Sequence, residues 1–151
     1  MSNTISEEQK QQFAARLDKL TPDSKATWGT MNVTQMLTHM NDAFRICLGM
    51  KPAIDKSNFL WNKIIFPAAV YVLPGFPKGA ATAKELNQNK EGSKPRDFNT
   101  ELEFLKKMLD VFNEREAEKV KPHPMFGKLS KEQWRDLLVK HLKHHLKQFG
   151  V

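Results

Sequence analysis

Cysteine and long apolar runs are both scarce in this chain of 151 residues. The only cysteine, Cys47, cannot form an intrachain disulfide, and the opening MSNTISEEQKQQ lacks the basic flank and apolar run of a signal peptide. The longest weakly charged run, IIFPAAVYVLPGFP, is interrupted by two prolines and falls short of a membrane span. We therefore expect a cytoplasmic protein in which this run is a buried segment.

Dense basic clusters are also missing, although the formal net charge is +7. Lysine and arginine are scattered between Lys51 and Arg96, without the interleaved aromatic residues typical of strand-binding surfaces. A solvated, mildly basic surface is the simplest interpretation, so we expect neither a nucleic-acid nor a membrane partner. The alternative is a basic module that docks such a partner through the LPGFPKG segment.

Apolar residues recur at helical spacing in four segments of the chain. With 40% hydrophobic residues, the chain is long enough for a single domain over residues 1–151 and too short for two. The pairs Ser6/Gln9 and Ser130/Gln133 have the capping-box pattern that starts a helix, and Asn32 can cap another. The predicted helices cover residues 6–20, 33–48, 98–116 and 130–150.

The connection between the second and third predicted helices is unusually long. It runs from Gly49 to Arg96 and contains an apolar piece, a turn-rich piece and a short candidate helix capped by Thr82. Residues 74–79 could form a lid over a functional site, since the crossover must pass a bundle end, or a rigid surface turn. Antiparallel neighbours need only a short loop, so this crossover predicts that the second and third helices run parallel. The predicted fold is all-α, a four-helix bundle with a long, partly helical crossover between helices 2 and 3.

Two histidines lie where the last predicted helix would normally carry leucine. His141 and His145 stand at positions i and i+4 of the apolar stripe, so both rings can reach one point. His39 borders the apolar stripe of the second predicted helix. If these two helices run antiparallel, the three residues lie at similar heights, since each helical residue rises about 1.5 Å. Three neutral imidazoles with a fourth position open to water are typical of a working zinc or nickel site.

Other interpretations of these polar residues stay open. A single histidine on an apolar face, as His39 is when taken alone, is often a hydrogen-bonded core residue. Burying two adjacent rings costs about 1–3 kcal/mol for each unsatisfied group, which a shared cation would offset. Gln148 could orient a ligand ring or a bound water, and we expect His123 and His144 to lie outside the ligand set. Asp42 is expected to be solvated, so no catalytic general base is assigned.

Four sequence pieces carry a resemblance to a known family. VTQMLTHMNDAF and HLKHHLKQ resemble the DinB-like superfamily of metal-binding four-helix bundles. KPHPMFGKLSKEQW and LPGFPKGAATAKEL are similar to a branch of unknown function. The resemblance covers most of the chain from about Leu20 to Gly150. It implies a DinB-like bundle whose metal triad is His39, His141 and His145.

The resemblance also implies classes of function. The superfamily includes S-transferases that use bacillithiol or mycothiol, a maleylpyruvate isomerase and metal hydrolases. We therefore expect a metal-dependent S-transferase or small-molecule hydrolase with zinc or nickel as its cofactor. The alternative is a non-catalytic binding or stress-response protein whose metal is structural or absent. The expected partners are a small-molecule substrate, such as a low-molecular-weight thiol, and a second copy of the chain in a homodimer.

Overall fold

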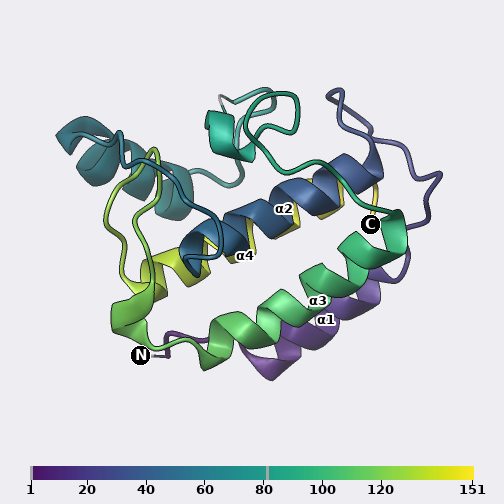
Figure 1. Ribbon diagram of the computed structural model, residues 1–151, viewed down its shortest axis with the longest axis horizontal. Helices are drawn as coiled ribbons and strands as arrows, with labels where there is room; N and C mark the ends of the chain where they lie inside the picture. Colours follow the sequence, from purple (N-terminus) through teal and green to yellow (C-terminus); the bar gives the residue numbers. More distant parts are fainter. Residues whose placement is uncertain (1, 81) are drawn as a thin grey trace.

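Four long helices form the body of the protein (Figure 1). The computed structural model describes residues 2–80 and 82–151, and within these residues it holds no strand beyond one isolated bridge between His123 and Gly127. The predicted all-α fold is thus confirmed. The long helices are α1 (Glu7–Leu17), α2 (Val33–Cys47), α3 (Phe98–Glu114) and α4 (Lys131–Gln148). Each ends slightly before its predicted boundary, because the last predicted residues form caps and turns.

Polar side chains cap α1, α2 and α4 at the predicted residues, whereas the cap of α3, Asp97, was not predicted. Asn32 with Gln35 and Ser130 with Gln133 form complete capping boxes, each satisfying donors that the first helical turn leaves free. Ser6 accepts a hydrogen bond from the backbone N–H of Gln9, which is the first half of the same motif. The prediction for Thr82 was wrong. In place of the helix predicted there, the structure has the 3-10 turn η3 (Lys84–Leu86), which has no side-chain cap.

The long crossover allows α2 and α3 to run parallel, as predicted, while α1 and α4 run in the opposite direction (Figure 1). The backbone N–H of Thr27, just before α2, donates to the carbonyl of Gln148 at the end of α4. At the other end, Lys121 N–H donates to Cys47 O and Trp134 Nε1 donates to Lys121 O. These contacts bring the start of each helix beside the end of the other, so α2 and α4 are antiparallel.

The apolar core takes side chains from all four long helices. The rings of Phe44 and Phe112 meet edge to face with centroids 6.3 Å apart, which joins α2 to α3. Full burial of such a side chain contributes roughly 1.5–3 kcal/mol, so the packed stripes hold the bundle together. The fully buried members include Phe13, Leu17, Met36, Leu37, Met40, Leu105 and Trp134.

The apolar run in the crossover is not buried, contrary to the prediction. Residues 59–72 form a helical segment that includes two π-helical turns, η1 (Trp61–Ile65) and η2 (Ala68–Val72). Phe66 and Val70 face inward, but a helix lying on the surface buries only one side. The other side is exposed and carries Phe59, Leu60, Ile64, Tyr71 and Val72.

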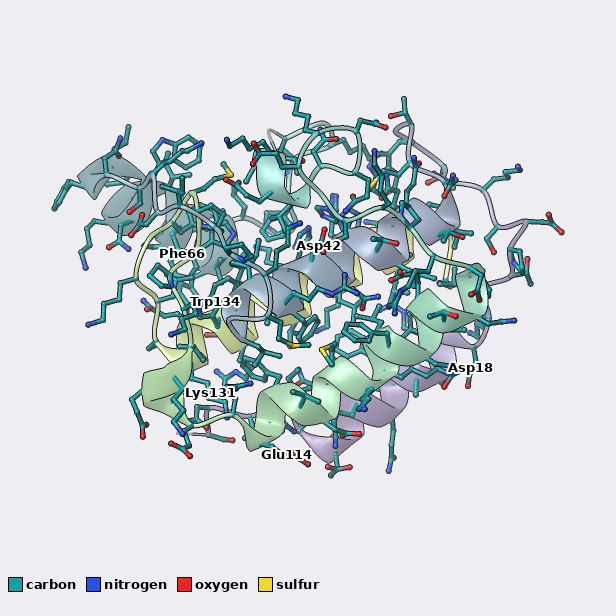
Figure 2. All side chains as sticks on the ribbon, viewed as in Figure 1. Asp18, Asp42, Phe66, Glu114, Lys131 and Trp134 are labelled. Atoms are coloured by element: carbon teal, nitrogen blue, oxygen red, sulfur yellow. The ribbon has the colours of Figure 1, made fainter. Side chains whose placement is uncertain are left out.

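An aromatic series joins this surface segment to α4. Phe66 packs against Phe126 at 5.3 Å between ring centroids, Phe126 against His123 at 4.7 Å, and His123 against Trp134 at 5.3 Å. Phe66 and Trp134 are labelled on this side of the bundle in Figure 2. Lys140 of α4 also donates to the carbonyls of Ala69, Val70 and Leu73. In the described part of the chain, no helix is long and apolar enough to cross a membrane.

Candidate metal centre

The antiparallel pair α2 and α4 brings three histidine rings together. His39 comes from the middle of α2, and His141 and His145 come from successive turns of α4. Nε2 of His141 lies 2.9 Å from Nε2 of His39 and 2.9 Å from Nε2 of His145. The ligand atoms of all three residues lie within 4.8 Å of one another. The predicted convergence of the rings from two helices is therefore confirmed.

Each of two rings is held by a partner on its outer nitrogen. His39 Nδ1 lies 2.7 Å from the carbonyl oxygen of Leu86, which can only accept, so Nδ1 carries the hydrogen and donates it. On α4, His145 Nδ1 lies 2.7 Å from Oε1 of Gln148. Gln148 Nε2 donates to the carbonyl of Trp28 at 2.9 Å, which fixes the amide so that Oε1 faces the ring. Gln148 thus orients a ring as predicted.

These outer partners determine what the inner nitrogens offer. In a neutral imidazole only one nitrogen bears hydrogen, so Nε2 of His39 and Nε2 of His145 both present lone pairs. Nε2 of His141 lies between them, and a single hydrogen on it can serve only one of the two. At least one buried lone pair is then left facing another nitrogen, at a cost of about 1–3 kcal/mol. One cation would accept all three lone pairs.

The dimensions of the cluster suit a small divalent ion. Zinc–nitrogen bonds of about 2.0–2.1 Å in a tetrahedral arrangement place ligand nitrogens about 3.3 Å apart. The two 2.9 Å separations around His141 are slightly shorter than this, and all ligand atoms lie within 4.8 Å of one another, so the rings would have to adjust their spacing around an ion.

Burial keeps the three imidazoles neutral, which is the form that binds metal. His39 is 4% exposed and His145 is 6% exposed, and desolvation lowers the pKa of both, that of His145 to about 3. Desolvation, followed by the nearby His145 and His39, lowers the pKa of His141 well below its usual value. The rings need not release protons when a metal ion binds near neutral pH.

Phe76 covers the ring cluster from the crossover side. Its ring centroid lies 5.6 Å from that of His141 and 5.7 Å from that of His144. Two residues later, the ammonium group of Lys78 lies 4.4 Å from the centre of the Trp28 ring. Two surface cavities of about 140 and 230 Å³ are lined by residues other than these histidines. Phe76 of the 74–79 segment thus lies between the ring of His141 and that of its neighbour His144 on one side of the cluster.

His123, His144 and Cys47 do not belong to the ring cluster. His123 and His144 lie outside the cluster, as expected. His123 is 6% exposed, and its Nδ1 accepts from the backbone N–H groups of Met125 and Phe126. Cys47 is a buried core residue whose thiol pKa is raised by desolvation, so it is no nucleophile.

The expectation that Asp42 is solvated was wrong. Its side chain is fully buried because the crossover packs over this face of α2. Sequence reasoning also missed the carbonyl of Leu86, since any residue can supply a backbone acceptor and no side-chain pattern marks it. Nothing in the sequence around Asp42 indicated that the turn-rich crossover would bury this carboxylate.

The fold and the ring cluster define a class of protein: an all-α bundle with a buried three-histidine cluster that could bind a metal ion. The chain belongs to the family described as "Protein of unknown function (DUF1569)", which it matches over residues 5–150. No match was found among the curated proteins or among the solved structures.

Proposed function

We propose that the protein binds one divalent metal ion, zinc or nickel, through Nε2 of His39, His141 and His145. The observation that carries this proposal is the crowding of three inner nitrogens whose lone pairs cannot all be satisfied by hydrogen bonds. Three neutral nitrogen ligands suit zinc and nickel. The resemblance to the DinB-like superfamily, in which this arrangement binds metal, supports the same assignment.

We further propose that the site is catalytic, transferring a low-molecular-weight thiol of the bacillithiol type or hydrolysing a small substrate. A divalent ion with an open coordination position would lower the pKa of a water or thiol that binds there. Leu86 and Gln148 hold two ligand rings in fixed orientations. Phe76 excludes water from the rings while the segment is closed. The 74–79 segment acts as a lid that moves to admit the substrate.

A second candidate is a non-catalytic binding or stress-response protein with a structural metal. One observation favours it: no carboxylate among the described residues joins the three rings in the potential metal-binding group. Asp42, the nearest acidic residue along α2, already accepts hydrogen bonds from Gln88, Ser93 and Arg45. It is therefore not free to act as a general base.

Metal analysis of protein purified without an affinity tag tests the binding proposal. We expect about one zinc or nickel ion per chain in the wild type and its loss in the double variant His141→Ala/His145→Ala. His144→Ala is the matched control, because His144 lies on the same helix and contacts His145 but is no ligand. Wild-type protein without stoichiometric metal, also after incubation with zinc or nickel, would contradict the proposal.

An assay of thiol transfer separates the two candidate functions. Metal-loaded protein is incubated with an electrophile and cysteine or a bacillithiol-type thiol, and loss of the free thiol is followed. Turnover that disappears in the double histidine variant supports the transferase, and turnover of ester or amide substrates supports the hydrolase. Full metal occupancy without turnover on either substrate class would favour the non-catalytic protein.

A further inference from the structure

The outer partner of His39 belongs to an irregular part of the chain. Leu86 ends η3, a single turn whose first residue has no side-chain cap. A ligating histidine takes its orientation and basicity from the group that accepts its other N–H. The position of the Leu86 carbonyl therefore matters for the metal site, and something other than regular secondary structure must hold it there.

The segment around Leu86 is folded into one closed unit. Glu91 N–H donates to Lys84 O at 3.0 Å, and Gly92 N–H donates to Asn87 O at 2.9 Å. A Cβ atom on Gly92 would lie 2.6 Å from the carbonyl carbon of Asn87, so the two ends of this loop touch. Because these bonds enclose Leu86, its carbonyl moves only when the whole unit moves.

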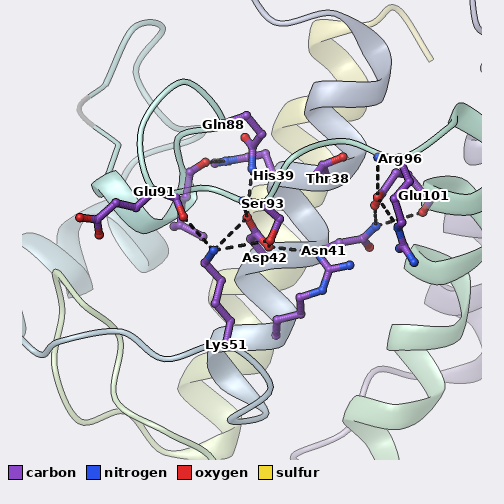
Figure 3. A network of polar contacts seen from close by, with 12 residues as sticks. Thr38, His39, Asn41, Asp42, Lys51, Gln88, Glu91, Ser93, Arg96 and Glu101 are labelled. Carbon is purple, nitrogen blue, oxygen red and sulfur yellow. Dashed lines mark hydrogen bonds and ion pairs between the residues drawn. The ribbon is translucent and has the colours of Figure 1, made fainter.

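Asp42 attaches this unit to the helix that carries His39 (Figure 3). Its Oδ2 accepts from Gln88 Nε2 at 3.1 Å and from Ser93 N–H at 2.7 Å. Its Oδ1 accepts from Ser93 Oγ at 2.6 Å and from Arg45 Nη1 at 2.9 Å. Gln88 and Ser93 lie at either end of the turn that follows Leu86, so one carboxylate holds both ends against α2.

Lys51, which follows the end of α2, reinforces the attachment. Its ammonium group donates to the carbonyl of Glu91 at 2.9 Å and lies 3.8 Å from Oδ2 of Asp42. The Asp42 carboxylate is fully buried, so its charge depends on these partners for compensation. The buried Asp42 carboxylate therefore holds residues 88–93 of the crossover against α2.

We propose that Asp42 is a positioning residue of the metal site: it holds the 84–93 unit on α2 and so places the Leu86 carbonyl against Nδ1 of His39. This inference rests on the proposed metal function and deepens it. Asp42 contacts neither the rings nor the ion. It acts on zinc affinity through the backbone of Leu86 and the tautomer of His39.

Asp42→Asn tests this role with little change in volume. The amide keeps one acceptor oxygen but turns an N–H group toward donors that need acceptors. We expect zinc affinity, measured by competition with a chromophoric chelator, to fall about 10–100-fold. Long-range ¹H–¹⁵N spectra of the metal-free protein should show His39 losing its single Nδ1–H tautomer. Ser93→Ala, which removes one donor only, should weaken zinc binding about threefold to tenfold.

Glu101→Gln is the matched control. Glu101 is another buried acidic side chain, at 1% exposure, and it binds Asn41 and Arg96 rather than the 84–93 unit. We expect the thermal stability of the Glu101→Gln variant to fall as in Asp42→Asn. The zinc affinity of Glu101→Gln should stay within about threefold of the wild type. A purely structural role of Asp42 would affect both variants alike.

Two results would overturn the inference: an unchanged His39 tautomer and zinc affinity in Asp42→Asn, or an equal loss of affinity in Glu101→Gln. If Asp42→Asn does not fold, Ser93→Ala tests the inference through the same two measurements, zinc affinity and the His39 tautomer. The metal-free spectra separate this inference from the proposed function. Wild-type protein that binds no zinc refutes the metal function and with it the effect on affinity, whereas zinc binding that Asp42→Asn leaves intact refutes only the positioning role.

Discussion

Gly29 lies directly against Gln148, the residue that orients the His145 ring. A Cβ atom on Gly29 would lie 2.8 Å from Nε2 of Gln148, and Gly29 has a positive φ of 81°. Gln148 Nε2 donates to the neighbouring carbonyl of Trp28. The absence of a side chain at residue 29 is therefore a condition for the hydrogen bond from His145 to Gln148.

Gly29→Ala should displace the Gln148 amide and weaken zinc binding about tenfold or more, because the His145 ring loses its fixed acceptor. Competition with a chromophoric chelator measures the effect. Gly150→Ala is the matched control, since its φ is 76° and its Cβ would meet nothing within 4 Å. Both variants should lose about 1 kcal/mol of stability from the strained backbone, but only Gly29→Ala should lose affinity. Equal affinities would contradict the prediction.

Stability should fall in mild acid, partly because of His123. Burial lowers the pKa of His123 to about 3, whereas the unfolded residue has a pKa near 6.5. Below pH 6.5 the unfolded chain takes up a proton that the folded protein does not. The free energy of unfolding therefore falls by up to about 1.4 kcal/mol per pH unit between pH 6.5 and about 3.

His123→Asn should reduce this dependence on pH. The amide oxygen can accept the backbone N–H groups of Met125 and Phe126 but does not titrate. Urea unfolding at pH 6, 5 and 4, in the presence of a chelator, measures the slope for both proteins. The variant should be less stable at pH 6 but lose about 1.4 kcal/mol less per pH unit. Identical slopes would show that His123 does not contribute.

Lys131 stabilises the end of α3 although it begins α4. Its buried ammonium group donates to Asn113 O at 3.0 Å and to Arg115 O at 2.6 Å. Lys131→Met leaves these carbonyls without their donor and should cost about 1–3 kcal/mol of unfolding free energy in urea titrations. The control Lys128→Met, at an exposed position, should change it by less than about 0.5 kcal/mol. A loss below that limit in Lys131→Met would contradict the assigned role.

Phe76→Ala should open the route to the ring cluster. Its ring contacts His141 and His144, so its removal uncovers the rings without changing any proposed ligand. We expect a chelator to remove zinc several-fold faster, as measured by stopped-flow absorbance. Val72→Ala is the control, because Val72 is 76% exposed. Equal removal rates in Phe76→Ala and the wild type would show that the 74–79 segment is no lid.

The histidine cluster could be predicted because it depends on two regular features. A spacing of four residues places His141 and His145 on one face of any α-helix, and the long crossover predicts the antiparallel arrangement that brings His39 to them. The capping residues Asn32 and Ser130 likewise act locally, within one helical turn. Local rules of this kind do not depend on what the rest of the chain does.

The crossover was harder to predict because its environment is set by contacts distant in the sequence. Asp42 lies outside the apolar stripe of α2, and only the docking of residues 84–93 takes it out of water. The apolar run of residues 64–77 suggested a buried segment, yet a surface helix buries only the side that carries Phe66 and Val70. Apolar composition indicates how much surface could be buried, but not which partner covers it.

The distance along the chain between His39 and His141, 102 residues, has a consequence for biosynthesis. A polypeptide emerging from the ribosome completes α2 long before the residues of α4 are translated. During that interval His39 has no companion imidazole, and a half-made chain cannot capture zinc or nickel at this place. Binding of the proposed metal ion would therefore have to follow the translation of α4 and its docking against α2.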